Sequence, residues 1–120
     1  MTTMSDERRA EAAMEFLAAS EREFAAGDEA QGSEKLWGAA SQAVIAVAQR
    51  RGWKYGSHQD LKVAAERLAV EQDDGTLGSD FAVAEKFHAN FYHLFMDDLQ
   101  LEQDPQYVRR FVLRVLALLD

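Results

Sequence analysis

The sequence has 120 residues, of which 48% are apolar, a composition that fits one folded domain over residues 1–120 and argues against general disorder. It contains no cysteine, so disulfides and thiolate metal sites are excluded, and its apolar runs are too short to span a membrane. The formal net charge of −8 argues against non-specific binding to nucleic acid, because phosphate binding needs positive charge. The N-terminus "MTTMSDERRAEAA" is charged, unlike a signal peptide, so we expect a cytoplasmic protein. We also expect that it uses no cofactor.

Apolar residues recur at helical spacing along the whole chain, and no stretch alternates as a strand would. Start and stop signals delimit five predicted helices, at about residues 5–26, 28–51, 57–70, 79–101 and 105–120. Gly27 is expected to end the first helix, while Asp28 and Ser57 are expected to cap the second and third. Ser79 is expected to cap the fourth, and Asp104–Pro105 is typical of a helix start.

Short loops between antiparallel helices predict an all-α fold, an up-and-down four-helix bundle with a short fifth helix. The fourth helix is expected to turn one apolar stripe inward, made of Phe81, Ala84, Phe87, Phe91, Leu94, Phe95 and Leu99. The fifth helix carries Leu113 and Leu116 off its main apolar stripe, which indicates that it packs against two surfaces. In a bundle this small the second surface can be another subunit, so we predict a homodimer through this C-terminal helix.

A basic turn joins the second and third predicted helices, "RRGWKYGSH". Residues 31–70 carry six basic and three acidic side chains, a local balance of +3 in an acidic protein. Arg51, Lys54 and His58 are candidates for binding a phosphate group, and Trp53 could stack on a base. In the alternative interpretation these residues only close a tight, glycine-hinged turn, and the cations compensate the helix dipole.

Two histidines lie on the fourth predicted helix, in "EKFHANFYHLF". His88 and His93 are separated by about 140° around a helix, so they cannot bind one metal ion from one face, and we predict no metal site. His88 is expected in the core, hydrogen-bonded to a tyrosine or to Ser41. Asn90, His93 and Asp97 are expected to form a polar strip in which His93 and Asp97 pair on the surface.

The runs "GDEAQGSEKLWGAASQAVIAVAQRRG", "SHQDL" and "FAVAEKFHANFYH" together resemble the PaREP-type family of small helical proteins. That family is usually grouped with the HEPN superfamily (higher eukaryotes and prokaryotes nucleotide-binding), and the resemblance covers roughly residues 8–100. It implies a four- or five-helix bundle that is often dimeric. Members of the wider superfamily include RNA-cutting toxins and nucleotide-binding partners of nucleotidyltransferases.

Active ribonucleases of that superfamily carry an Arg-x4–6-His motif on their later helices. Here the segment that matches by position is "HANFYH", in which His88 stands where the arginine should be. A neutral imidazole replaces the guanidinium fork poorly as a phosphate ligand. The sequence therefore favours a non-catalytic, dimeric binding or interaction module for a nucleotide or a partner protein. The alternative is a metal-independent endoribonuclease that uses His88, Asn90 and His93.

Overall fold

The computed structural model describes residues 4–120, and this range is all-α, with six helices and no strand. The helices are α1 (Asp6–Ala25), α2 (Glu29–Arg51), α3 (His58–Glu71), α4 (Gly75–His93), α5 (Asp98–Gln103) and α6 (Pro105–Ala117). The predicted all-α class is confirmed for these residues. Within residues 4–120, no helix combines the length and the apolar character that a membrane crossing requires.

The first two helix connections follow the predicted signals. Gly27 has a φ of 82°, and the Asp28 side chain then caps α2 by accepting the backbone N–H of Gln31 at 3.0 Å. At its other end α2 stops on Gly52, whose φ of 73° is a left-handed conformation that glycine adopts without strain. The Ser57 hydroxyl accepts the backbone N–H of Asp60 at 3.1 Å and so caps α3.

The predicted start of the fourth helix at Ser79 is wrong. α4 begins at Gly75, four residues before Ser79, because the Asp74 carboxylate accepts the backbone N–H of Thr76 at 3.0 Å and caps the helix there. The Ser79 hydroxyl instead donates to the backbone carbonyl of Thr76 at 3.2 Å, a bond inside the helix.

The predicted end of the fourth helix at Leu101 is also wrong. α4 stops at His93, since Leu94 takes a left-handed conformation with φ 47° and ψ 51°. A separate short helix, α5, follows after a four-residue turn, and Asp97 caps it. The side-chain oxygen of Asn90 explains the break, because it accepts the backbone N–H of Met96 at 2.9 Å and pulls the chain out of the helix.

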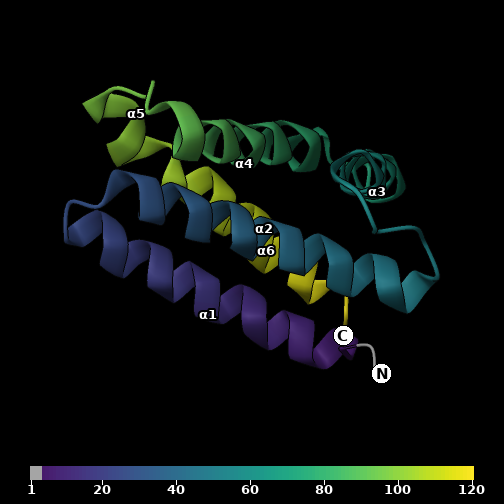
Figure 1. Ribbon diagram of the computed structural model, residues 1–120. Helices are drawn as coiled ribbons and strands as arrows, with labels where there is room; N and C mark the ends of the chain where they lie inside the picture. The colour runs from purple at the N-terminus through teal and green to yellow at the C-terminus, as the bar shows by residue number, and fades with distance from the viewer. Residues whose placement is uncertain (1–3) are drawn as a thin grey trace.

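Figure 1 shows α1, α2, α4 and α6 running lengthwise, with α1 and α2 antiparallel neighbours. α3 is seen end-on at one end of the molecule, and α5 lies at the other end. α2 packs against α1, α4 and α6, while α3 packs mainly against α4. The up-and-down order expected from short loops therefore does not describe α3, which crosses the others, and the C-terminal helix is one of the lengthwise elements.

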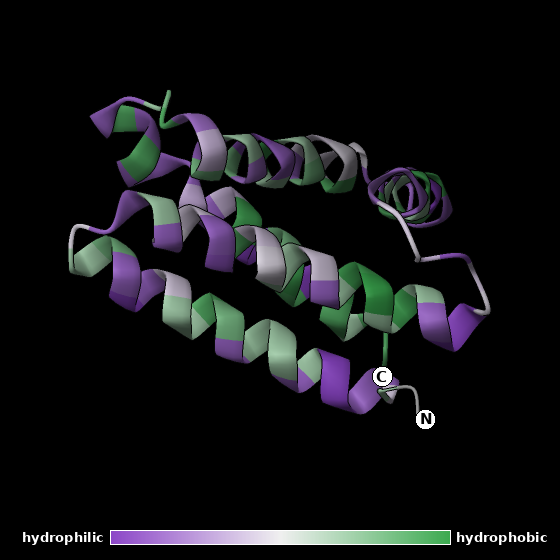
Figure 2. Ribbon diagram, viewed as in Figure 1, coloured by the Kyte–Doolittle hydropathy of each residue, from purple (hydrophilic) through white to green (hydrophobic). Residues whose placement is uncertain are grey.

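The core is centred on α2, whose small side chains allow its neighbours to approach closely. The fully buried alanines of α2 are Ala39, Ala40, Ala43, Ala46 and Ala48. A Cβ atom on Gly32 would lie 2.6 Å from the Phe24 ring, so only glycine permits this approach of α1. On the other side of the core, Phe81 of α4 contacts Phe111 of α6 with ring centroids 5.7 Å apart. Figure 2 shows the resulting alternation of hydrophobic and hydrophilic residues along the helices.

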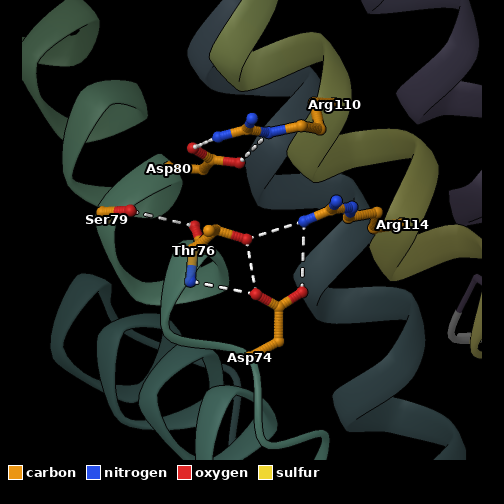
Figure 3. Close-up of polar contacts among 6 residues, drawn as sticks. All are labelled: Asp74, Thr76, Ser79, Asp80, Arg110 and Arg114. Carbon is orange, nitrogen blue, oxygen red and sulfur yellow. Dashed lines mark hydrogen bonds and ion pairs between the residues drawn. The ribbon is translucent and has the colours of Figure 1, made fainter.

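Two ion pairs fix the first half of α4 to α6 (Figure 3). The Asp80 carboxylate is 2% exposed and accepts two hydrogen bonds from Arg110, at 2.9 Å and 2.6 Å, which raises the pKa of the Arg110 guanidinium. Arg114 donates to Asp74 at 3.1 Å and to the Thr76 hydroxyl at 2.6 Å. The hydrogen bonds from Thr76 hold the pKa of Asp74 below its usual value. This network sets the position of α4, which runs from one end of the molecule to the other.

Candidate functional site

A cavity of about 320 Å³ lies where α2 turns into α3. Its lining residues are Gly52, Trp53, Lys54, Asp60, Val63, Ala64 and Arg67. The α3 residues among them are spaced i, i+3, i+4 and i+7 from Asp60, so they form one stripe along that helix. The cavity is therefore walled by the turn on one side and by a single face of α3 on the other.

The left-handed C-cap at Gly52 determines where Trp53 lies. After Gly52 reverses the chain, the backbone N–H of Trp53 donates to the carbonyl of Ala48 at 2.8 Å. The indole then packs partly buried against the core. The Arg67 guanidinium lies 4.2 Å from the centre of the Trp53 ring, and the Arg51 guanidinium lies 5.3 Å from it. Two cations on one indole make this an aromatic site of positive potential.

The cations around Trp53 differ in whether they are neutralised. Arg51 forms an ion pair with Glu71. Arg67 and Lys54 have no carboxylate within ion-pair distance among residues 4–120. Asp60 contributes the only carboxylate of the lining, and it accepts the backbone N–H of Gly56 at 3.2 Å. Two cations and one carboxylate leave the cavity wall with a formal charge of +1, in a protein whose net charge is −8.

The four predicted binding residues are only partly brought together. Trp53 and Lys54 line the cavity, and Arg51 flanks it through its contact with the indole. His58 lies apart, with its Nε2 atom 2.8 Å from the Glu85 carboxylate on α4. The His58 ring also contacts the Trp37 ring, with centroids 4.9 Å apart. His58 therefore links α3 to α4 and does not line the cavity.

His88 does not make the predicted hydrogen bond. Its ring stacks on Trp37, with centroids 4.7 Å apart and an interplanar angle of 24°, and it meets the Tyr92 ring edge-on at 5.6 Å. The His88 Nδ1 atom and the Ser41 hydroxyl are both buried without a hydrogen-bond partner among the described residues. The expected pairing with Ser41 is therefore wrong, and aromatic stacking holds this histidine in place.

The expected polar strip of Asn90, His93 and Asp97 is wrong as well. Asn90 is fully buried, its amide nitrogen donates to the Ser33 hydroxyl at 3.0 Å, and its oxygen is engaged by Met96. His93 is exposed at the last position of α4, and Asp97 caps α5 instead of pairing with it. The structure therefore does not bring His88, Asn90 and His93 to one site, because Asn90 points into the core.

Arg67 and Asp60 complete the cavity and were not among the predicted binding residues. Arg67 belongs to the basic stretch of the sequence, but 14 positions separate it from Trp53 and hide their contact. The signal that could have found both residues is the stripe of Asp60, Val63, Ala64 and Arg67 on α3. That stripe mixes charges with small apolar residues beside a tryptophan, as a small ligand site does.

Within the described range, no group of three or more histidine, aspartate or glutamate side chains is placed to hold a metal ion. Comparison with curated proteins found no match, and neither did comparison with solved structures. One family model matches residues 8–112, which is most of the chain. The chain therefore belongs to the archaeal PaREP1/PaREP8 family.

Proposed function

We propose that this protein is a non-catalytic, HEPN-like binding module and that the cavity at the α2–α3 corner takes a mononucleotide. The observation that carries the proposal is the position of Arg67, which stacks on Trp53, lines the cavity and has no ion-pair partner among residues 4–120. A guanidinium without a carboxylate partner is well suited to bind a phosphate.

The lining of the cavity matches the three parts of a nucleotide. Trp53, Val63 and Ala64 offer an aromatic and apolar wall for a base. Arg67 and Lys54 offer hydrogen-bond donors for the phosphate, and the Asp60 carboxylate can accept a ribose hydroxyl. The volume of about 320 Å³ lies at the lower end of the range for ligand sites, which favours a mononucleotide over a larger ligand.

The geometry supports binding better than catalysis. A metal-independent ribonuclease needs a general base and phosphate ligands around one point. Asn90 is committed to the core through both atoms of its amide, and His93 lies exposed beyond it. His58 is paired with Glu85 outside the cavity. Among residues 4–120, the three residues predicted for the ribonuclease alternative, His88, Asn90 and His93, do not converge on one point, which favours the binding module.

The homodimer remains part of the proposal. Leu113 is 43% exposed on the outer side of α6, while Leu116 packs partly against the core. The free apolar surface of α6 is thus carried by Leu113 and by Tyr107, which is 37% exposed. We expect light scattering at micromolar concentration to give the mass of a dimer, and Leu113→Lys to give that of a monomer. A monomeric wild-type protein would contradict this part of the proposal.

Calorimetric titration with AMP, adenosine and inorganic phosphate tests the nucleotide site. We expect AMP to bind, and adenosine and phosphate to bind at least about tenfold more weakly, since each lacks half of the contacts. Arg67→Gln should weaken AMP binding by about tenfold, the usual effect of losing one charge-assisted hydrogen bond.

Arg109→Gln is the matched control, because it removes the same charge from α6, where Arg109 pairs with Glu21 away from the cavity. This variant should bind AMP as the wild type does. The proposal is overturned if AMP does not bind at millimolar concentration, or if the two arginine variants lose the same affinity.

A further inference from the structure

The turn between α4 and α5 exposes an unusual concentration of large apolar side chains. Tyr92, Leu94, Phe95 and Leu99 are 65%, 56%, 51% and 60% exposed, and they lie within eight residues of one another. Figure 2 shows hydrophobic ribbon segments at this end beside hydrophilic ones. Single exposed apolar residues need no explanation, but a cluster of this kind marks an interaction surface. We name these four residues the α4–α5 patch.

The turn holds the patch outward by a set of specific contacts. Met96, in the middle of it, is only 6% exposed and anchors the turn in the core. Its backbone N–H donates to the side-chain oxygen of Asn90. The next residue, Asp97, forms a reciprocal capping box with Gln100 that starts α5. Because Met96 is held inside, Leu94 and Phe95 are held outside. The patch is therefore presented in a fixed geometry, which lowers the entropy lost on binding.

The backbone at Leu94 supports the same interpretation. A φ of 47° is a conformation that favours glycine, and helices commonly end on glycine at this position. A turn whose only task was to end α4 would be more stable with glycine at position 94 and a polar residue at position 95. Backbone strain in combination with exposed apolar side chains is typical of residues retained for binding.

An acidic cleft lies beside the patch. Its volume is about 470 Å³, and its lining residues are Phe24, Gly27, Glu29, Asp98, Leu101 and Glu102. None of its three carboxylates forms an ion pair with another side chain within residues 4–120. Two apolar side chains and three free carboxylates suit the aliphatic stem and charged head of a lysine or arginine.

We propose that the α4–α5 corner docks a basic amphipathic helix of a partner protein. The apolar face of that helix would cover the α4–α5 patch, and a lysine or arginine at its edge would enter the acidic cleft. The charges select this occupant, because the cleft beside the patch carries three carboxylates that form no ion pair within residues 4–120, those of Glu29, Asp98 and Glu102. Nucleic acid and anionic membranes would be repelled by the same charges. The proposal goes beyond nucleotide binding and is independent of it.

The probe is a fluorescent amphipathic helical peptide made of leucine and lysine, with its leucines at i, i+3, i+4 and i+7. Fluorescence anisotropy should show binding to the wild-type protein, and a peptide with glutamate in place of lysine should not bind. The double variant Phe95→Ser, Leu99→Ser should weaken binding by at least tenfold. Asp98→Asn with Glu102→Gln should weaken it by a similar factor and reduce its salt dependence.

Matched controls separate a specific site from general attraction to an acidic protein. Val70→Ser removes an apolar side chain that is 83% exposed on α3, and Glu66→Gln with Asp73→Asn removes two charges outside the corner. These controls should change the affinity less than twofold. The proposal is overturned if the controls and the corner variants weaken binding equally. It is also overturned if the free protein self-associates through the patch, so that Phe95→Ser converts a dimer into a monomer.

Discussion

At the α2–α3 corner the helix ends on Gly52 with φ 73°, and at the α4–α5 corner it ends on Leu94 with φ 47°. The same left-handed conformation is free of strain at the first position and strained at the second. Beyond Gly52 the chain folds Trp53 back against α3 and the core, and cations surround the ring. Beyond Leu94 the chain turns apolar side chains toward solvent, next to free carboxylates.

This difference indicates two kinds of ligand. The α2–α3 corner, here called the basic corner, is a concave site with an indole and unpaired cations, which fits a small anion that carries a ring. The α4–α5 corner, here called the acidic corner, is a solvent-exposed apolar surface with an acidic cleft at its edge, which fits a cationic helix. Because α4 connects the neighbourhood of α3 to α5, one rigid element supports both ends (Figure 1).

The largest expected effect is at Asn90, which supports only the acidic corner. Asn90→Ala leaves the Ser33 hydroxyl and the Met96 N–H without their partner and opens a small cavity. We expect the free energy of unfolding to fall by about 3 kcal/mol, measured by urea denaturation. The exposed His93→Ala should change it by less than about 0.5 kcal/mol. A small effect of Asn90→Ala would show that the turn is not held by this side chain.

The two helix ends should respond to exchange of their residues with opposite signs. Leu94→Gly should raise the free energy of unfolding by about 1 kcal/mol, since it relieves the left-handed strain at a side chain that is 56% exposed. Gly52→Ala should lower it by about 1 kcal/mol, although a Cβ there meets nothing within 4 Å. Thermal and urea denaturation of both variants measure the difference. Equal signs would contradict the assignment of strain to Leu94 and not to Gly52.

The smallest expected effect concerns the ion pair between Asp6 and Arg50, which joins the start of α1 to the last turn of α2 beside the basic corner. The hydrogen bond from Arg50 holds the pKa of Asp6 below its usual value of 3.8. A depressed pKa in the folded state means that the pair stabilises the fold above pH 3.8, and that this contribution is lost as the pH falls through the folded pKa.

Urea titrations of the wild type and Asp6→Asn measure this contribution. The variant should have the lower midpoint at pH 7, and the two midpoints should converge at a pH below the folded pKa of Asp6, where both side chains are uncharged. A constant difference between the midpoints at both pH values would show that the charge of Asp6 is not the cause.

More of the structure of the basic corner than of the acidic corner could be predicted from the sequence. Gly52 and Ser57 are residues with strong local preferences, and they end α2 and begin α3 as expected. The α4–α5 turn has no such signal. Leu94, Phe95 and Leu99 continue the helical spacing of the preceding residues and were predicted to face inward, but the structure exposes all three.

The reason is a tertiary contact that no local pattern encodes. Asn90 bonds to Ser33 on another helix and to Met96 across the turn, and both contacts follow from packing. The candidate site shows the same limit on a smaller scale. Trp53 and Lys54 are neighbours in the sequence and could be recognised together. Arg67 lies on α3 and meets them only because the α2–α3 turn brings that helix beside Trp53.

Chemical-shift mapping of one labelled sample with two ligands tests the central claim, that the two corners bind different ligands. AMP should shift the backbone signals of residues 52–67 and the indole N–H of Trp53, while the indole of Trp37 stays in place. The leucine–lysine peptide should shift the signals of residues 92–102 whether or not AMP is present. A single set of residues that responds to both ligands, or a basic corner that AMP leaves unchanged, would contradict the account.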